Sequence, residues 1–323
     1  MKRVVLVFLC LLILCSAFSA VAEDVTKVVA LKGPTAMGMV QMMKQSKDGE
    51  LTDPALQFEI AAAIDVVTPM LVKGEVDIAA VPANLASVLY NNTNGGVRVL
   101  AINTLGVLYI VESGNQVDSV ESLRGKTIYA SGKGATPEYA LNYILSQNGI
   151  DPEKDVTIEW KSEHAECLAA LMNDANGIAM LPQPFVTTAM TKAENIRVAL
   201  DLTEEWEKLQ KDPENRSAML TGVVVARTEY VEQHPEQVRA FLDQYAASVD
   251  FVNEPVEEAA ELIGEFEIVP AAVAVKAIPA CNIVCIRNQE MQQKLSGYLA
   301  VLMEQNPKAV GGQLPAEDFY FVE

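Results

Sequence analysis

The chain has few of the residues from which metal and catalytic sites are built. Its 323 residues include only two histidines and five cysteines. Two histidines are too few for a His-rich zinc site. His164 and Cys167 are one helical turn apart, but no fourth strong metal ligand is in view, and the pair lacks a third group to orient a catalytic base. We therefore expect no metal ion, no cofactor and no catalytic activity.

Positive charge is also scarce. Lys and Arg number 24 against 43 Asp and Glu, which gives a formal net charge of −19. Binding to nucleic acid requires a basic face that neutralises phosphates, so we expect no nucleic-acid partner. Half of the residues are hydrophobic and 21% are charged, as in a globular protein, and the length suits about two domains.

Long hydrophobic runs are absent except at the N-terminus. Lys2 and Arg3 precede an apolar run over residues 4–15, which is followed by small residues ending in Ala20-Val21-Ala22. The run is shorter than the roughly 20 residues of a membrane-spanning helix, and the ending suits signal peptidase. We therefore predict a signal peptide over residues 1–22 and a mature protein that is soluble and extracytoplasmic, in the periplasm or at the cell surface.

The cysteines do not form a disulfide framework. Leucine stands directly before each of the two N-terminal cysteines, where a lipoprotein has a small residue, so a lipid anchor is disfavoured. After the signal peptide only Cys167, Cys281 and Cys285 remain, an odd number in a chain that is long enough to fold without crosslinks. We expect buried free thiols, and a disulfide between Cys281 and Cys285 remains open.

What the sequence does contain is a duplicated α/β pattern. A strand over 27–31, a Gly-containing turn and a helix over 36–44 recur as a strand over 126–130, a Gly-rich turn and a helix over 137–147. Each half then adds a strand, a helix and a third strand that ends in proline, and the two prolines, Pro82 and Pro182, are 100 residues apart. This repetition predicts two lobes, each with a mainly parallel sheet flanked by helices.

The chain is expected to cross between these lobes twice. Residues 97–105 are predicted to form the last strand of lobe 1, residues 106–112 a crossing strand, and residues near 221–227 the return connection. The sequence then becomes mostly helical, with an extended segment near 281–286. We assign 23–105 and about 228–323 to lobe 1 and about 106–227 to lobe 2, so that the two crossovers form a hinge.

The expected binding site follows from where the parallel strands end. Ligands of open α/β sheets bind outside the carboxyl ends of the strands, and four loops at such ends can be read here. Glycines let the backbone approach a ligand, Thr136-Pro137 looks like a helix N-cap followed by a first-turn proline, and two lysines add positive charge. The expected ligand-binding residues are Lys32, Gly33, Pro34, Thr35, Asn84, Ser131, Gly132, Lys133, Gly134, Ala135, Thr136 and Gln183.

Other roles remain open for some of these residues. Asn84 follows a strand where an Asn more commonly caps the next helix, and either lysine is equally placed to be solvated. Neither glycine-containing loop has the spacing of a phosphate-binding P-loop, so nucleotide binding is not indicated.

Two runs carry a family resemblance. Residues 68–79, TPMLVKGEVDIA, and residues 119–128, SVESLRGKTI, with the Gly-rich turn that follows, resemble solute-binding proteins of bacterial ABC importers. The nearest branch takes nitrate, taurine, aliphatic sulfonates and thiamine-pyrimidine precursors. Extending over nearly the whole mature chain, the resemblance implies a two-lobed type II periplasmic-binding-protein fold. It also implies that the four loops line the interlobe cleft and that an ABC permease is the partner.

The expected function is therefore capture of a small polar or anionic solute by a monomeric binding protein that is not an enzyme. One alternative is an enzyme on the same fold, of the kind that makes thiamine-pyrimidine or menaquinone precursors, which would need a reactive His or Cys cluster and no export signal. Another is an extracellular ligand-sensing protein, which would normally be joined to a spanning helix. The identity and charge of the solute remain open.

Overall fold

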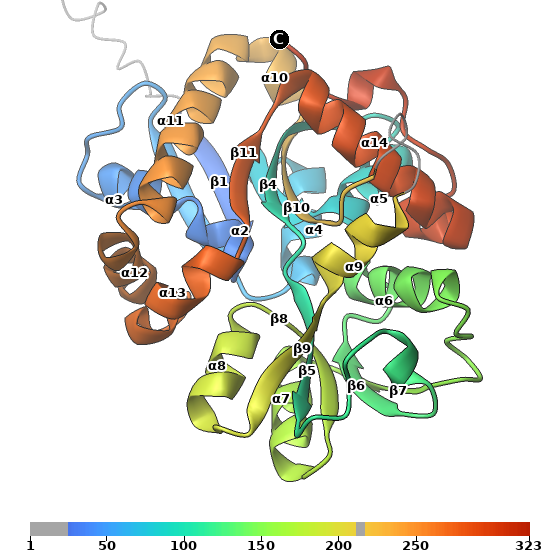
Figure 1. Cartoon of the computed structure of the whole chain (residues 1–323). Coiled ribbons are helices and arrows are strands. Elements are labelled where there is room, and N and C mark those ends of the chain that lie inside the picture. The colour runs from blue at the N-terminus through green and yellow to red at the C-terminus, as the bar shows by residue number, and fades with distance from the viewer. Residues whose placement is uncertain (1–24, 211–216) are drawn as a thin grey trace, which may run out of the picture.

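The structure is a computed structural model that describes residues 25–210 and 217–323. It has two lobes, each built on one sheet with helices packed against it (Figure 1). We call the lobe with the six-stranded sheet lobe 1 and the lobe with the five-stranded sheet lobe 2; they are the upper and lower lobes of Figure 1. The expected signal peptide, residues 1–22, lies outside the described residues.

The sheet of lobe 1 has the strand order β11-β4-β10-β3-β1-β2. Its strands are β1 (Thr26–Leu31), β2 (Leu56–Ala61), β3 (Ile78–Pro82), β4 (Val97–Leu105), β10 (Leu220–Arg227) and β11 (Ile283–Ile286). The sheet of lobe 2 has the order β7-β6-β8-β5-β9. Its strands are β5 (Leu108–Ser113), β6 (Thr127–Ser131), β7 (Thr157–Lys161), β8 (Ile178–Pro182) and β9 (Ile196–Asp201).

The duplication seen in the sequence is present in the strand order. In lobe 1 the order β3-β1-β2 places the third strand beside the first, and β8-β6-β7 repeats this arrangement in lobe 2. These three strands are parallel in each sheet, whereas the other strand pairs are antiparallel. Both sheets are therefore mixed, where the sequence predicts mainly parallel ones, because β10 and β5, arriving from the opposite lobe, run against β3 and β8.

The chain first passes from lobe 1 to lobe 2 between β4 and β5, at Gly106 and Val107, so that residues 108–112 of the expected crossing strand 106–112 already belong to β5 of lobe 2. The return crossing needs a correction. Residues 221–227, expected to be the connection, belong to β10, which pairs with β3 and β4 inside the sheet of lobe 1. The apolar run of β10 is buried between two neighbouring strands, so the chain has crossed back before Leu220.

Four helices belong to lobe 2: α6 (Thr136–Gln147), α7 (His164–Asn173), α8 (Phe185–Lys192) and α9 (Leu202–Leu209). The helices around the sheet of lobe 1 are α2 (Pro34–Met37), α3 (Val40–Lys47), α4 (Ile64–Lys73), α5 (Ala83–Asn92), α10 (Thr228–Gln233), α11 (Pro235–Asn253), α12 (Val256–Glu265), α13 (Ala271–Ala277) and α14 (Asn288–Gln305).

The single helix predicted over residues 36–44 is divided into α2 and α3. The division falls at Gly38, where a methyl group would lie only 3.0 Å from both Ile283 Cγ2 of β11 and the Tyr245 hydroxyl of α11. Close packing of two distant elements on this point, which no local pattern reveals, accounts for the break.

Aromatic side chains join the lobes near the return crossing. Trp206 of α9 is buried, and its ring lies 4.4 Å from that of Tyr143 in α6 and 5.6 Å from that of Tyr298 in α14. The Trp206 indole donates to Ser217 Oγ at 2.9 Å, just before β10. These aromatic contacts pack α6 and α9 of lobe 2 against α14 of lobe 1.

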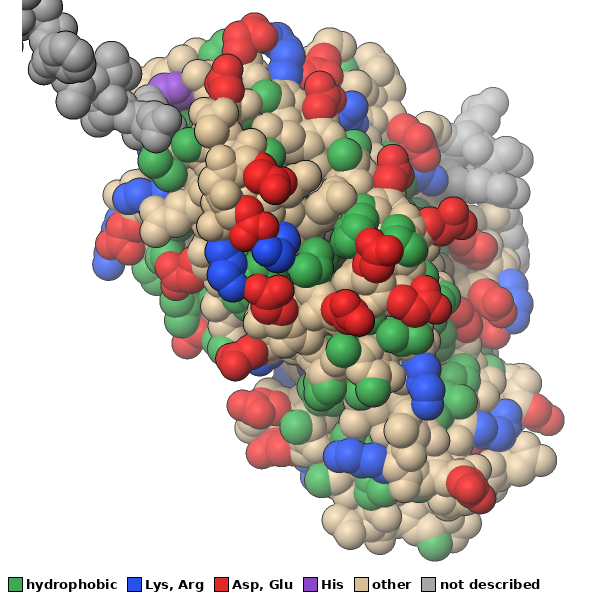
Figure 2. All heavy atoms as spheres, turned by 90° about the vertical axis from the view of Figure 1, so that its left-hand side faces the viewer, with side chains coloured by type: hydrophobic (Ala, Val, Ile, Leu, Met, Phe, Trp, Pro, Cys, Tyr) green, Lys and Arg blue, Asp and Glu red, His purple; other side chains and the backbone are tan. Residues whose placement is uncertain are grey.

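The three cysteines within the described residues are free, as the sequence predicts: Cys167 and Cys281 are buried and Cys285 is half-buried. None of the helices in residues 25–210 and 217–323 is both long and apolar enough to span a bilayer. Figure 2 shows acidic side chains spread over one face of lobe 1, where they outnumber Lys and Arg.

Candidate functional site

The expected binding loops of the two lobes contact each other directly. Thr136, the first residue of α6 in lobe 2, donates from its hydroxyl to Asn84 Oδ1 of α5 in lobe 1 at 3.3 Å. Both side chains are buried. Gln183, which follows β8, donates from its backbone N–H to the carbonyl of Val107 in the first crossing at 3.0 Å. The loops after β3, β6 and β8 therefore lie at the junction of the lobes.

In lobe 1 the first of the expected binding loops follows β1. The buried Thr35 donates from its hydroxyl to the Leu31 carbonyl at 2.7 Å, which fastens the start of α2 to the end of β1. Gly33 has φ +132°, and a Cβ built on it meets no atom within 4 Å, so its backbone borders open space. Lys32 is exposed, next to the half-buried Pro34.

In lobe 2 the corresponding loop after β6 is centred on Ser131. The Ser131 hydroxyl lies 2.5 Å from Nδ1 of His164, the first residue of α7; Ser131 is buried and His164 is half-buried. Burial lowers the pKa of His164 to about 4, so the imidazole is neutral at neutral pH. The imidazole also packs against the Phe185 ring, with centroids 5.4 Å apart.

The glycine-rich turn that follows adopts left-handed backbone conformations. Gly132 has φ +84° and Gly134 has φ +79°, and a Cβ on Gly134 would meet no atom within 4 Å. The Gly134 N–H donates to Glu138 Oε2 at 2.5 Å. Lys133 is exposed between the two glycines.

The expected N-cap role of Thr136 is wrong. The cap position of α6 is occupied by Ala135, no side chain caps the helix, and Thr136 is already helical. The carboxylate of Glu138 takes the free N–H of the preceding loop instead, which leaves the Thr136 hydroxyl to contact Asn84.

Asn84 does not cap α5 either, because Pro82 holds the cap position and no side-chain cap bond forms. Its Nδ2 donates to the Ala309 carbonyl at 3.3 Å while its Oδ1 accepts from Thr136. The amide therefore connects three segments: α5, the turn η3 (Pro307–Val310) and α6.

Gln183 is buried at the start of α8. Its Oε1 accepts from the Thr187 hydroxyl at 2.8 Å and from the Thr187 N–H at 3.3 Å. The side chain thus closes the first turn of α8, much as a cap would.

Two residues that sequence reasoning did not select belong to this region. His164 was set aside as a metal ligand or catalytic residue, yet it follows β7, at the same edge of the sheet as the loop after β6. Asn103 lies in the last part of β4, is fully buried, and has no hydrogen-bond partner at either Nδ2 or Oδ1. Asn103 carries a signal that the sequence shows, a polar side chain near the carboxyl end of a mostly apolar strand, whereas His164 follows the polar strand β7 and carries no such signal.

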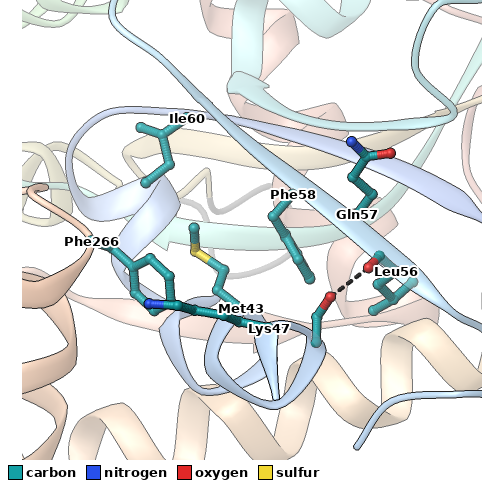
Figure 3. Close-up of a pocket in the computed structure, with 8 residues that line it drawn as sticks. Met43, Lys47, Leu56, Gln57, Phe58, Ile60 and Phe266 are labelled. Atoms are coloured by element: carbon teal, nitrogen blue, oxygen red, sulfur yellow. Dashed lines mark hydrogen bonds between the residues drawn. The ribbon is translucent and has the colours of Figure 1, made fainter. Parts of the chain in front are cut away.

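No group of three or more His, Cys, Asp or Glu side chains arranged to hold a metal ion occurs in the described part of the chain. A surface pocket of about 420 Å³ lies elsewhere, on lobe 1 between α3 and the edge strand β2 (Figure 3). Met43, Phe58, Ile60 and Phe266 make its wall mostly apolar, and it includes none of the expected ligand-binding residues.

Comparison with known proteins identifies relatives. The family described as "ABC transporter, phosphonate, periplasmic substrate-binding protein" matches residues 49–272. A search of curated protein sequences gives no significant match.

Solved structures share the fold along almost the whole chain. An ABC transporter protein from Parabacteroides distasonis superposes with a TM-score of 0.78 at 23% identity, covering 92% of this chain and 98% of the other. The periplasmic aliphatic sulphonate binding protein SsuA from Escherichia coli gives 0.72 at 15% identity, covering 92% of each chain. The alkanesulfonate-binding protein SsuA from Xanthomonas axonopodis pv. citri, bound to MOPS, gives 0.66 at 13% identity, covering 90% and 94%.

Proposed function

The chain belongs to the family of periplasmic substrate-binding proteins of phosphonate ABC transporters, and from this premise we propose that it captures a small polar or anionic solute between its lobes. The same membership places the protein outside the cytoplasm and makes an ABC permease its partner. We propose a place of binding and the residues that bind, and we propose that the solute is not chemically converted.

A hydrogen bond between the lobes is the main support for the proposed place of binding. The hydrogen bond from Thr136 to Asn84 brings loops that are far apart in sequence, and on different lobes, to one buried contact. A solute bound beside this contact would touch both lobes at once, which is the requirement for a ligand that closes a hinge.

The chemistry of the surrounding groups supports a polar solute. Hydroxyls and amides are buried on both sides: Thr35, Asn84, Ser131, Thr136 and Gln183. Gly33 and Gly134 add backbone that borders open space. The cationic side chains among the twelve expected residues, Lys32 and Lys133, are exposed. We therefore propose that neutral donors hold the solute and that the lysines attract an anionic one from the rim.

Binding without conversion is part of the proposal. Ser131 and His164 resemble the nucleophile and base of a catalytic triad, but within residues 25–210 and 217–323 no carboxylate hydrogen-bonds to the second ring nitrogen of His164. Burial alone lowers the pKa of His164, to about 4, which is poor for a base at neutral pH. We interpret the pair as a rigid hydrogen-bonding group and propose that the solute leaves the protein unchanged.

Titration calorimetry on variants from both lobes tests the proposed place. Lys32→Ala in lobe 1 and Lys133→Ala in lobe 2 remove exposed side chains, so the fold should be unaffected. An exposed rim charge contributes about 0.2–1 kcal/mol and acts mainly on the association rate, so each variant should bind an anionic solute up to about fivefold more weakly. A thermal-shift screen of phosphonates, sulfonates, nitrate, carboxylates and pyrimidines supplies the solute, which stabilises the fold by about 2.7 kcal/mol at a hundred times its Kd.

The matched control is Lys192→Ala, an exposed lysine at the far end of α8 from Gln183. It should bind as the wild type does. If only one lobe's variant weakened binding, or if the control weakened it equally, the interlobe site would be contradicted. Steady conversion of the solute during the titration would contradict the binding-only function.

Export is proposed from the N-terminal sequence. We expect cleavage between Ala22 and Glu23, and the intact mass of the secreted protein measures it. A lipid-modified N-terminus at Cys10 or Cys15 would replace this expectation with a membrane anchor. We also propose that the secreted protein is a monomer, with light scattering as the measurement.

A further inference from the structure

We propose that Asn103 is a specificity-determining residue, which selects solutes whose head group both donates and accepts hydrogen bonds. The inference rests on the proposed function, because it assumes that a solute binds at the junction of the lobes. It adds a residue outside the twelve derived from the loops and states which head groups that residue favours.

The position of Asn103 is set by an irregularity in the sheet. Opposite β10, Ile102 pairs with Val223 and Thr104 pairs with Gly222, and the register shifts between these two pairs. Asn103 therefore has no partner of its own on β10. Such bulges redirect a side chain, and they are frequent beside functional sites.

Glycine at position 222 makes room for the redirected side chain. A methyl group built on Gly222 would collide with Asn103 Oδ1 and would lie 2.6 Å from Thr35 Cγ2. Asn103 and Thr35 thus lie side by side over Gly222, and Thr35 belongs to the loop after β1. This places the Asn103 amide next to the lobe 1 wall of the proposed site.

The amide is buried without partners. Asn103 is 0% exposed, and neither Nδ2 nor Oδ1 makes a hydrogen bond with any residue that the structure describes. The hydroxyl of the next residue, Thr104, is also buried and unpartnered. Buried polar groups are almost always satisfied in native proteins, so a polar ligand is the natural partner for this amide.

The chemistry of a carboxamide defines the partner. It offers N–H donors at one end and a carbonyl acceptor at the other, and both ends are free here, so the argument does not depend on which end is nitrogen. A head group that satisfies both must present an acceptor oxygen and a donor hydrogen. A sulfonate presents only acceptors, whereas a phosphonate monoanion carries one P–O–H hydrogen beside its acceptor oxygens.

The first experiment asks whether the amide serves binding or the fold. In Asn103→Leu the side chain has similar volume and no polar atoms. If the amide serves binding and not the fold, this variant should unfold at a denaturant concentration equal to or above that of the wild type. It should also bind the solute at least tenfold more weakly. Wild-type affinity in this variant would overturn the proposal.

The matched control is Ser248→Ala. Ser248 on α11 is also 0% exposed with an unpartnered hydroxyl, but it lies on a helix that does not carry the proposed site. This variant should bind as the wild type does. If Asn103→Leu folds poorly, Asn103→Ala removes the same amide and is measured in its place.

The second experiment measures selection with two probes that share one carbon skeleton, 2-aminoethylphosphonate and 2-aminoethanesulfonate. At pH 6 a phosphate-like head group still carries one hydrogen, because its second pKa is about 6 or above. The wild type should bind the phosphonate at least tenfold more tightly, and Asn103→Ala should reduce this preference to less than threefold. Equal binding of both probes, a preference for the sulfonate, or binding of neither would overturn the selection. The proposed function itself would fail in a different way: in that case no solute of the wider thermal-shift screen would bind the wild type.

Discussion

Single polar side chains decide whether the loops at the junction of the lobes bind a solute or only connect strands. Ser131, Asn84 and Gln183 were selected from the sequence because they follow strands, and all three are buried at the junction. Lys32 and Lys133 were selected for their charge, and both are exposed. Lys32 also directly follows a strand, so position at a strand end does not by itself determine burial.

Asn103 and His164 show why other side chains were missed. Asn103 lies inside a mostly apolar strand, and only a register shift directs it toward Thr35. His164 lies 33 residues from Ser131 in sequence, and their contact depends on β6 and β7 pairing in parallel. A local pattern carries neither the register of a sheet nor the choice of partner strand.

The lowered pKa of His164 predicts how the free energy of unfolding depends on pH. Its pKa is lowered to about 4 in the folded protein, against about 6.5 when unfolded. As the pH falls below 6.5, His164 becomes protonated in the unfolded chain but stays neutral in the folded one. The free energy of unfolding therefore falls until the pH reaches about 4. Above 6.5 this contribution is constant.

His164→Asn keeps a partner for Ser131 and removes the titration. Urea unfolding between pH 4 and 7.5 should show that the wild type loses about 3 kcal/mol more than this variant over the range. Other acidic groups titrate in both proteins and cancel in the comparison. Parallel stability curves would show that His164 is protonated as easily in the folded state as in the unfolded one.

Strands and helices were predicted more reliably than the way they are joined. β4 was predicted with its observed bounds, and the strands and helices of the duplicated halves lie within a few residues of their expected positions. The exceptions share a cause. The division of α2 from α3 at Gly38 and the inclusion of β10 in the sheet of lobe 1 both arise from contacts with elements distant in sequence.

A substitution at Gly222 of β10 tests how closely β4 and α2 must approach this strand. In Gly222→Ala the added methyl group meets Asn103 and Thr35, so overpacking should lower the free energy of unfolding by about 1–3 kcal/mol. Because these two side chains must move, solute binding should weaken as well. Denaturant unfolding and titration calorimetry measure the two effects.

The comparison variant is Val223→Ala, at the next position of the same strand, where a fully buried side chain is shortened. It should lose stability through a cavity but keep its affinity. Equal loss of affinity in both variants would show that binding responds only to the overall stability of the sheet.

The two lobes contact each other at several points. Besides the bond from Thr136 to Asn84, the hydroxyl of Tyr109 in β5 of lobe 2 donates to the carbonyl of Ala280 at 3.2 Å. Ala280 ends the turn η2 (Ile278–Ala280), which leads into β11 of the lobe 1 sheet. α13 also contacts α8, and α14 contacts α6 (Figure 1). The described arrangement is therefore one in which the lobes touch.

Tyr109→Phe tests whether this arrangement is the state that binds. Removing the Tyr109 hydroxyl deletes one interlobe hydrogen bond, worth about 0.5–1.5 kcal/mol, and leaves each lobe intact. If the solute binds only when the lobes touch, its apparent affinity falls with the population of that state, so binding should weaken about 2- to 12-fold. Small-angle scattering should show a larger mean radius for the unliganded variant and the same compact radius as the wild type at saturating solute.

Tyr129→Phe is the matched control, because the Tyr129 hydroxyl bonds to Asp174 within lobe 2, and it should change neither the affinity nor the radius. Wild-type affinity together with an unchanged radius in Tyr109→Phe would mean that the interlobe contact does not limit binding, and the site would then have to lie within a single lobe.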